Sequence, residues 1–147
     1  MLSHLAFNQL PEINEQLVTG REEIFFGAEF DASAGTHKLP DDTVRYYIDT
    51  LKDPDCLRGS FGFYRAIPAS ITQNEQRKAR RLTLPVLAIG GAEGIGEGAA
   101  TTMKLAADDV HSVVIPGSGH YRLEEAPEEV LAALTAFLAP YRDATAA

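Results

Sequence analysis

The spacing of hydrophobic and polar residues divides the chain into two parts of different character. Up to Arg81, apolar residues recur at intervals of three and four positions, as is typical of amphipathic helices. From Leu82 onward, short unbroken apolar runs alternate with helical patterns, as is typical of buried strands that are connected by helices. The pattern predicts a helical segment over residues 1–81 and a mixed α/β segment over residues 82–147.

The first part predicts a series of short helices with a loop between them. The helices are expected over residues 11–30, 41–54 and 56–68. Gly20 interrupts the first of these patterns, and Pro68 closes the last. Residues 31–40 are mostly small and turn-forming and predict a loop, whereas the polar and basic residues 74–81 predict a connector into the second part.

The second part follows the order strand, helix, strand, helix. The strands are expected over residues 84–91 and 111–117, and the helices over residues 94–109 and 127–141. This order implies two parallel strands that are joined by a right-handed crossover. The last helix has one apolar face, formed by Val130, Leu131, Leu134, Phe137 and Leu138.

Two parallel strands alone leave unpaired backbone groups at both edges of the sheet. Parallel sheets are nearly always larger than this and are covered on both faces, and unpaired edges invite association. We therefore expect the two strands to form one end of a larger sheet. We also expect the chain to associate, or to form a homodimer, through an exposed sheet edge.

The composition narrows the classes of partner and cofactor. The 147 residues fit one domain, and the net charge of −8 argues against nucleic acid, whose phosphates would repel such a surface. The single cysteine and the four histidines show no metal-ligand spacing, and residues 90–96 lack the glycine spacing of a dinucleotide-binding turn. We therefore expect no metal and no cofactor. No secretory signal and no apolar run of about 18 residues is visible, so we expect a cytoplasmic protein without a membrane partner.

A histidine stands at the end of the second predicted strand, in the run PGSGHY of residues 116–121. Open α/β sheets place their ligands at the carboxyl ends of strands. An imidazole at that place can activate water near neutral pH if a carboxylate orients its other nitrogen. His120 is therefore a candidate base, and Glu93, which follows the first strand, is the candidate carboxylate. The alternatives are a surface histidine on a strand-to-helix turn and an exposed loop glutamate.

The second part, from LPVLAIGG to PGSGHYRLEEAPEEVLAALTAFL, resembles the last two strands and helices of an α/β-hydrolase. More narrowly, it is similar to the epoxide hydrolase and haloacetate dehalogenase branch. The catalytic histidine of that branch occupies a Gly-x-Gly-His-aromatic turn that is followed by acidic residues and Pro-Glu-Glu, and His120 matches that position. The resemblance implies an α/β fold with a helical cap over residues 1–81. The terminal β-α-β-α unit of an incomplete α/β-hydrolase fold would then cover residues 82–147.

The resemblance extends into the first part and implies two further site residues. SHLAFNQLPEINEQLVTGREEIFF resembles the opening of the helical cap, and GSFGFYRAIP resembles the cap segment whose tyrosine points into the active site. In epoxide-opening members, two cap groups donate hydrogen bonds to the epoxide oxygen and stabilise the developing alkoxide. Tyr64 and His4 match these two groups. The alternatives are an aromatic residue of a helix core and a terminal histidine without a role.

The reaction that the resemblance implies also needs groups that do not occur in this sequence. In this branch an aspartate attacks the epoxide or the halogenated carbon, and the histidine then activates the water that releases the ester. No Gly-x-Ser-x-Gly or Gly-x-Asp-x-Gly elbow and no His-Gly oxyanion loop is found in the 147 residues. Some members carry the orienting acid at the position of Glu93, whereas others carry it after an earlier strand, which would precede Met1.

Three explanations follow from the missing nucleophile. The chain is a carboxy-terminal fragment of a hydrolase, or one half of a split hydrolase, or a noncatalytic remnant that acts as a dimerising or binding module. The isolated chain is expected to be inactive. A small-molecule substrate is expected only if an amino-terminal half completes the enzyme.

Overall fold

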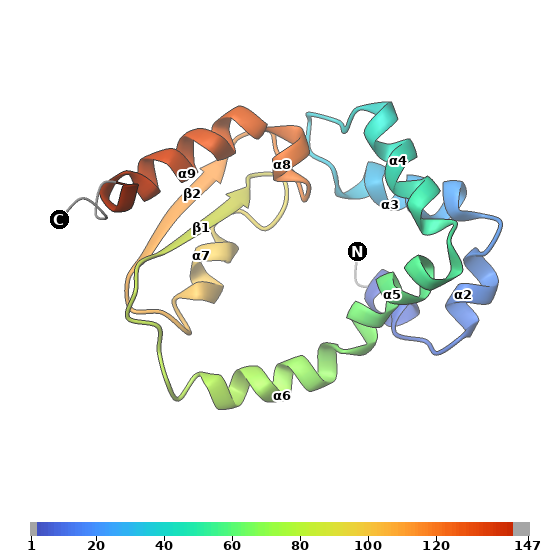
Figure 1. The fold of residues 1–147 in the computed structure, drawn as a ribbon, viewed down its shortest axis with the longest axis horizontal. Helices are drawn as coiled ribbons and strands as arrows, with labels where there is room; N and C mark the ends of the chain where they lie inside the picture. The colour runs from blue at the N-terminus through green and yellow to red at the C-terminus, as the bar shows by residue number, and fades with distance from the viewer. Residues whose placement is uncertain (1–2, 143–147) are drawn as a thin grey trace. The chain divides into compact units, whose positions relative to one another are not determined.

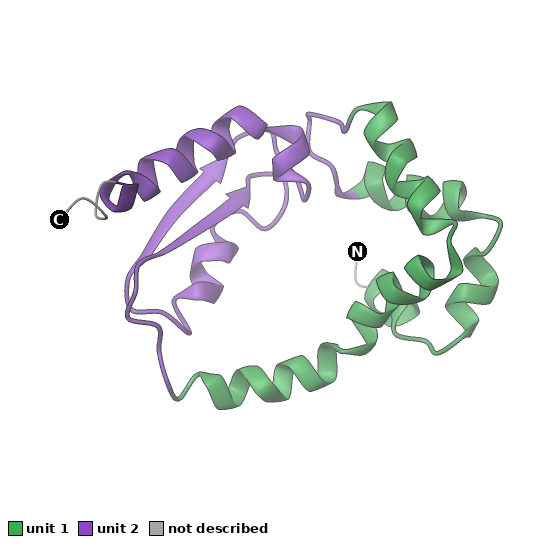
Figure 2. Cartoon of the chain, viewed as in Figure 1, with its two compact units in different colours: residues 1–32, 40–79 green, residues 33–39, 80–147 purple. Residues whose placement is uncertain are grey.

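The computed structural model describes residues 3–142 and divides them into two units (Figure 2). The described residues of unit 1 fall within 1–32 and 40–79, and those of unit 2 within 33–39 and 80–147. The predicted roles of residues 1–81 as a cap and of residues 82–147 as a hydrolase core stay predictions. The structure adds that residues 33–39, which the sequence pattern placed in the first part, belong to the unit that contains the sheet.

Unit 1 is helical, as the sequence pattern predicts (Figure 1). Its helices are α1 (Ser3–Asn8), α2 (Ile13–Val18), α3 (Glu22–Ser33), α4 (Asp41–Leu51), α5 (Pro54–Arg65) and α6 (Ile67–Arg77). Gly20, with a φ of 78°, separates α2 from α3 in a left-handed conformation that costs glycine little. Asp53 caps α5 because its side chain accepts the N–H groups of Asp55 and Cys56.

The core of unit 1 is aromatic. The buried residues are Val18, Leu57 and Phe61, and the partly buried Phe7, Phe25 and Phe26 pack against them. The rings of Phe7 and Phe25 have centroids 5.3 Å apart, and those of Phe25 and Phe26 have centroids 5.0 Å apart. Phe7 belongs to α1 and Phe61 to α5, so this core holds those two helices against each other.

The prediction of a connector over residues 74–81 was wrong for its first half. Helix α6 continues through Arg77, and the Lys78 N–H group donates to the Asn74 carbonyl oxygen at 3.0 Å. The segment contains glutamine, glutamate and arginine, which are good helix formers. Helix α6 contains no buried residue, and Pro68, which was expected to close the preceding helix, lies in its first turn.

Unit 2 contains two parallel strands that lie between helices (Figure 1). The elements are β1 (Val86–Gly91), α7 (Gly98–Met103), β2 (Val110–Ile115), α8 (Arg122–Glu125) and α9 (Pro127–Arg142). The register runs from Val86 opposite Val110 to Gly91 opposite Ile115. Helices α7 and α9 lie on opposite sides of the strands. The predicted order of strand, helix, strand and helix is therefore confirmed.

The core of unit 2 is small. Ile115, Ala126 and Val130 are buried, and Ile89 and Val113 pack against them. The rest of the predicted apolar face of α9 is largely exposed: the exposed fractions are 64% for Leu131, 38% for Leu134 and 51% for Leu138. Strand β2 is exposed at His111 and Ser112, so the prediction that it is buried along its length holds only toward its carboxyl end.

Candidate active site

His120 lies just beyond the carboxyl end of β2. After Ile115 the chain passes through Gly117, whose φ of 70° favours glycine, and then reaches the histidine. His120 is exposed, and its ring packs edge-on against the ring of Tyr121, with centroids 5.2 Å apart. The imidazole therefore has access to water at the strand end where open α/β sheets place ligands.

Backbone hydrogen bonds join the turn after β1 to the turn after β2. The Ala92 N–H group donates to the Ile115 oxygen at 2.9 Å, and the Glu93 N–H group donates to the Ser118 oxygen at 3.0 Å. The Glu93 carboxylate accepts a hydrogen bond from the Thr36 hydroxyl. Among the described residues, no hydrogen bond joins that carboxylate to His120. The role of Glu93 as the orienting acid stays a prediction.

A third segment, residues 33–39, packs against the turn that carries His120. The His120 N–H group donates to the Ser33 oxygen at 2.8 Å, and the His37 N–H group donates to the Gly117 oxygen at 3.3 Å. The sequence pattern predicts a loop for this segment but does not predict the segment that it contacts. A run of small residues gives no sign of the distant segment that it contacts.

Glycines make this contact possible. A methyl group on Gly35 would collide with the Gly117 oxygen and would lie 2.6 Å from the Gly119 nitrogen. A methyl group on Gly119 would lie 2.5 Å from the Ser33 oxygen. The two backbones can approach this closely only because neither glycine has a side chain.

The buried carboxylate of Glu125 connects the same two segments. Its Oε2 accepts the N–H groups of Gly35 at 2.9 Å and Gly119 at 2.6 Å, and its Oε1 accepts the Tyr121 N–H group at 2.8 Å. Burial alone raises the pKa of this carboxyl. The three backbone donors and the neighbouring Arg122 guanidinium outweigh that effect, so the pKa lies below its ordinary value. Glu125 therefore carries a charge at neutral pH and was missed by the sequence analysis.

Ser118, next to these segments, is fully buried. Its hydroxyl has no hydrogen-bond partner among the described residues. Because the hydroxyl is enclosed, it is not an accessible nucleophile. This agrees with its sequence context, which is not a nucleophile elbow.

The other two predicted site residues lie in unit 1. His4 belongs to α1 and Tyr64 to α5, and their rings meet edge-on with centroids 6.2 Å apart and planes at 87°. Both residues are half-buried. The structure thus brings this predicted pair together, while the action of the pair on a substrate stays a prediction.

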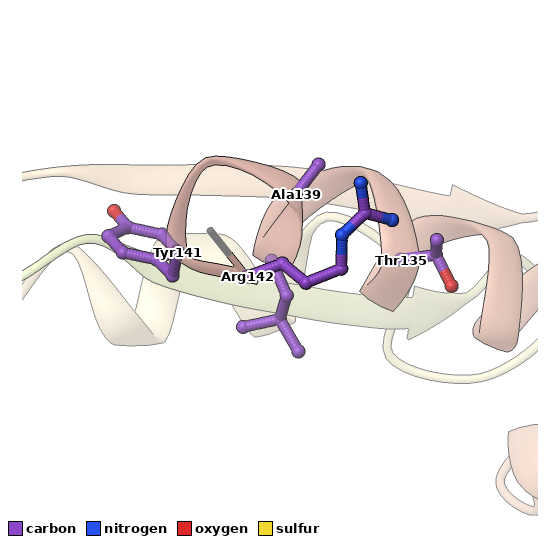
Figure 3. Close-up of a pocket in the computed structure, with 5 residues that line it drawn as sticks. Thr135, Ala139, Tyr141 and Arg142 are labelled. Atoms are coloured by element: carbon purple, nitrogen blue, oxygen red, sulfur yellow. The ribbon is translucent and has the colours of Figure 1, made fainter. Parts of the chain in front are cut away.

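Other surface features lie away from these residues. An open depression of about 410 Å³ lies near the end of α9, and Figure 3 shows its lining residues as sticks. It is lined by Thr135, Leu138, Ala139, Tyr141 and Arg142. Within residues 3–142, no three histidine, cysteine or acidic side chains form a group that could hold a metal ion. No helix in the described part of the chain has the length and hydropathy needed to cross a membrane.

Comparison with known proteins finds relatives that share the fold over most of this chain. The chain is 23% identical to the soluble epoxide hydrolase of Corynebacterium sp. (strain C12) over 146 residues, which are 97% of this chain and 51% of that protein. The Cif epoxide hydrolase from Acinetobacter nosocomialis is 27% identical to this chain, with a TM-score of 0.85. The match covers 92% of this chain and 44% of the chain of that protein. Cfl2 from Burkholderia cenocepacia is 27% identical with a TM-score of 0.83 and matches 92% of this chain and 47% of its own.

These likenesses cover only part of each relative. The chain spans about half the length of the curated relative and just under half of each of the two solved structures. No protein-family model matches the chain.

Proposed function

We propose that this chain supplies the base of an epoxide hydrolase and the groups that bind the epoxide oxygen. The chain has the fold of the carboxy-terminal half of an α/β-hydrolase and is similar to epoxide hydrolases. The likeness confirms the predicted fold class. A fold alone does not determine an activity, and the chain spans about half of its relatives. The activity is therefore argued from the site.

The proposed reaction needs a second segment that carries an aspartate nucleophile. That aspartate attacks one epoxide carbon, the carbon–oxygen bond breaks, and an ester of the aspartate forms while the ring oxygen takes up a proton. His120 then removes a proton from water, and the resulting hydroxide attacks the ester carbonyl. The free aspartate returns and a diol leaves. The proton that His120 took from water replaces the one that the ring oxygen took up, so one epoxide and one water give one diol.

The observation that carries the proposal is the position of His120. The imidazole is exposed at the carboxyl end of β2, and its backbone is held by the Ser33 oxygen. A general base must be accessible to water and held in place, and the exposed ring and the hydrogen-bonded backbone of His120 support such a role. Its sequence context, Gly-Ser-Gly-His-Tyr, supports the same role by resemblance.

The pairing of His4 with Tyr64 supports an epoxide over a haloacetate as the substrate. An epoxide oxygen gains negative charge as the ring opens, and two aimed donors stabilise that charge. The tyrosine hydroxyl and an imidazole N–H group can both donate, and the two rings lie 6.2 Å apart. The displacement of a halide from a haloacetate creates no alkoxide for such a pair to bind.

Complementation tests this function. The chain is mixed with an amino-terminal half that contains the oxyanion loop and the Gly-x-Asp-x-Gly elbow, taken from the gene region upstream of Met1 or from an epoxide hydrolase relative. Turnover of styrene oxide and of chloroacetate is then measured. We expect diol from the mixture and none from either half alone. Turnover that survives His120→Ala, with His111→Ala as the matched control, would contradict the proposal.

A noncatalytic dimerising module is the second candidate. The observation in its favour is the two-stranded sheet, since each strand of the described sheet has one neighbour and therefore one unpaired edge. If no amino-terminal half restores turnover and the chain forms a stable homodimer, this second candidate replaces the first.

A further inference from the structure

Glu125 occupies an unusual position for a carboxylate. Its exposed fraction is 7%, and it lies at the end of α8, directly after the turn that contains His120. Buried carboxylates are costly unless they are paired or hydrogen-bonded. Three backbone N–H groups satisfy this one, so its placement depends on those three bonds.

The three donors come from two distant parts of the chain. Gly119 and Tyr121 are the residues immediately before and after His120, and Gly35 belongs to the segment of residues 33–39. One side chain therefore fixes the peptide groups on both sides of the histidine. It also holds the segment whose Ser33 oxygen accepts the His120 N–H group.

We propose that Glu125 is a positioning residue that fixes the backbone on both sides of His120 and thereby sets the direction of the imidazole. The inference rests on the proposed function of His120 as the base. Glu125 touches no substrate atom in this account.

The carboxylate cannot be replaced by its amide without loss. Both carboxylate oxygens only accept, so they match three donors. In a Glu125→Gln variant, either the Tyr121 donor or the pair from Gly35 and Gly119 faces an NH2 group. Hydrogen bonds to charged groups are stronger than neutral ones, so the amide also weakens the bonds that it keeps.

Nuclear magnetic resonance of the full 147-residue chain tests the inference without any need for turnover. The ring resonances of the four histidines are assigned by substitution and then followed in Glu125→Gln. We expect the His120 ring resonance to shift or broaden and the His111 resonance to stay. We also expect amide exchange at Gly119 and Tyr121 to become about tenfold faster or more. A hydrogen bond to a charged group changes an equilibrium constant by about that factor or more.

The matched control is Glu128→Gln, which removes the same charge from an exposed position in the first turn of α9. We expect this control to leave the His120 resonance unchanged. A folded Glu125→Gln chain with an unchanged His120 resonance overturns the inference. An equal change in Glu128→Gln overturns it as well, since the effect would then be one of charge alone.

If Glu125→Gln does not fold, the wild-type chain gives the same information by acid titration. We expect the amide protons of Gly35, Gly119 and Tyr121 to move together, with one midpoint below the ordinary glutamate value of 4.5. The His120 ring resonance is expected to respond at the same midpoint. Separate midpoints for the three amides, or an unresponsive ring, contradict the inference. Neither result depends on complementation. A failure of this inference can therefore be told apart from a failure of the proposed enzyme activity.

Discussion

At the scale of residues, the turn around His120 depends on glycines and backbone groups more than on side-chain packing. Gly35 and Gly119 let two backbones touch, and Glu125 joins them through hydrogen bonds. Such an arrangement leaves no room for added side-chain atoms, because backbone atoms cannot move aside as the tip of a flexible side chain can.

Gly35→Ala tests this tolerance. The added methyl group overlaps the Gly117 oxygen, so we expect the free energy of unfolding to fall by about 1–3 kcal/mol. The control is Gly59→Ala in α5, where nothing lies within 4 Å of the added methyl. That control is expected to gain about 0.5–1 kcal/mol, because alanine is the better helix former. Urea unfolding measures both, and similar effects of the two substitutions would refute the close contact.

Tyr64→Phe tests the pair with His4. Only the hydroxyl is removed, so the edge-on ring contact is kept and the free energy of unfolding is expected to stay within about 0.5 kcal/mol of wild type. In the complemented enzyme we expect kcat for an epoxide to fall about 10²–10³-fold, as for other lost oxyanion donors. Tyr46→Phe, at an exposed tyrosine of α4, serves as the control. Equal kcat values for Tyr64→Phe and the control would remove Tyr64 from the proposed site.

Sequence reasoning proposed site residues that stand at ends of predicted elements or match a family motif, and their roles stay predictions. His120 and Glu93 were proposed because parallel strands place their carboxyl ends together, and His4 with Tyr64 came from resemblance to a cap. Glu125 was not found. Its role depends on Gly35, and no periodic pattern connects two residues so far apart in the chain.

At the scale of elements, the pH dependence of the stability of unit 2 follows from Glu125, which connects helix α8 to the loop of residues 33–39. The groups that face the Glu125 carboxylate are the backbone N–H groups of Gly35, Gly119 and Tyr121 and the Arg122 guanidinium on α8. His37 from the loop and His120 from the turn lie on the adjoining segments. Burial raises the pKa of Glu125, but the backbone donors and the Arg122 guanidinium outweigh burial, so the pKa lies below its ordinary value.

A lowered pKa in the folded state means that the unfolded chain binds the proton more readily. The stabilisation from Glu125 is therefore complete above the unfolded value, near 4.5, and is lost as the pH falls through the lower folded value. We expect wild type to lose more unfolding free energy between pH 7 and pH 3 than Glu125→Gln does. Urea unfolding at both pH values measures this difference. An equal loss in the two proteins would show that Glu125 is not the responsible group.

Helices and strands were predictable where their apolar residues pack against another element of the chain. The strands and α4 were found because their buried faces pack against described neighbours, as Ile48 does. Helix α6 was missed because Pro68 was expected to end the preceding helix, whereas it lies in the first turn of α6. The apolar face of α9 was recognised from the sequence, yet most of this face is exposed. The described part of the chain therefore does not cover it.

At the scale of the whole molecule, unpaired strand edges and the exposed leucines of α9 predict association. Leu131, Leu134 and Leu138 recur at helical spacing along one side of α9. Exposed apolar patches of this kind commonly mark an interaction surface. An amino-terminal half that adds strands to the sheet would cover both features.

Sedimentation velocity tests this expectation. We expect the isolated chain to form dimers or larger species with rising concentration, and to form a one-to-one complex when an amino-terminal half is added. The double substitution Leu131→Glu and Leu138→Glu is expected to weaken both kinds of association. Leu123→Glu, at an exposed leucine of α8, is the control. A chain that stays monomeric in every mixture would contradict the account of its surface.

The central claim, that His120 activates the water of the second step, is tested most directly by intact-mass measurement. The chain with His120→Ala is mixed with the complementing amino-terminal half and an epoxide. We expect the amino-terminal half to gain the mass of one epoxide, because the ester forms and is not hydrolysed. With wild-type His120 we expect diol and no lasting adduct. Undiminished diol from the His120→Ala mixture, or an adduct on this chain instead of its partner, would contradict the claim.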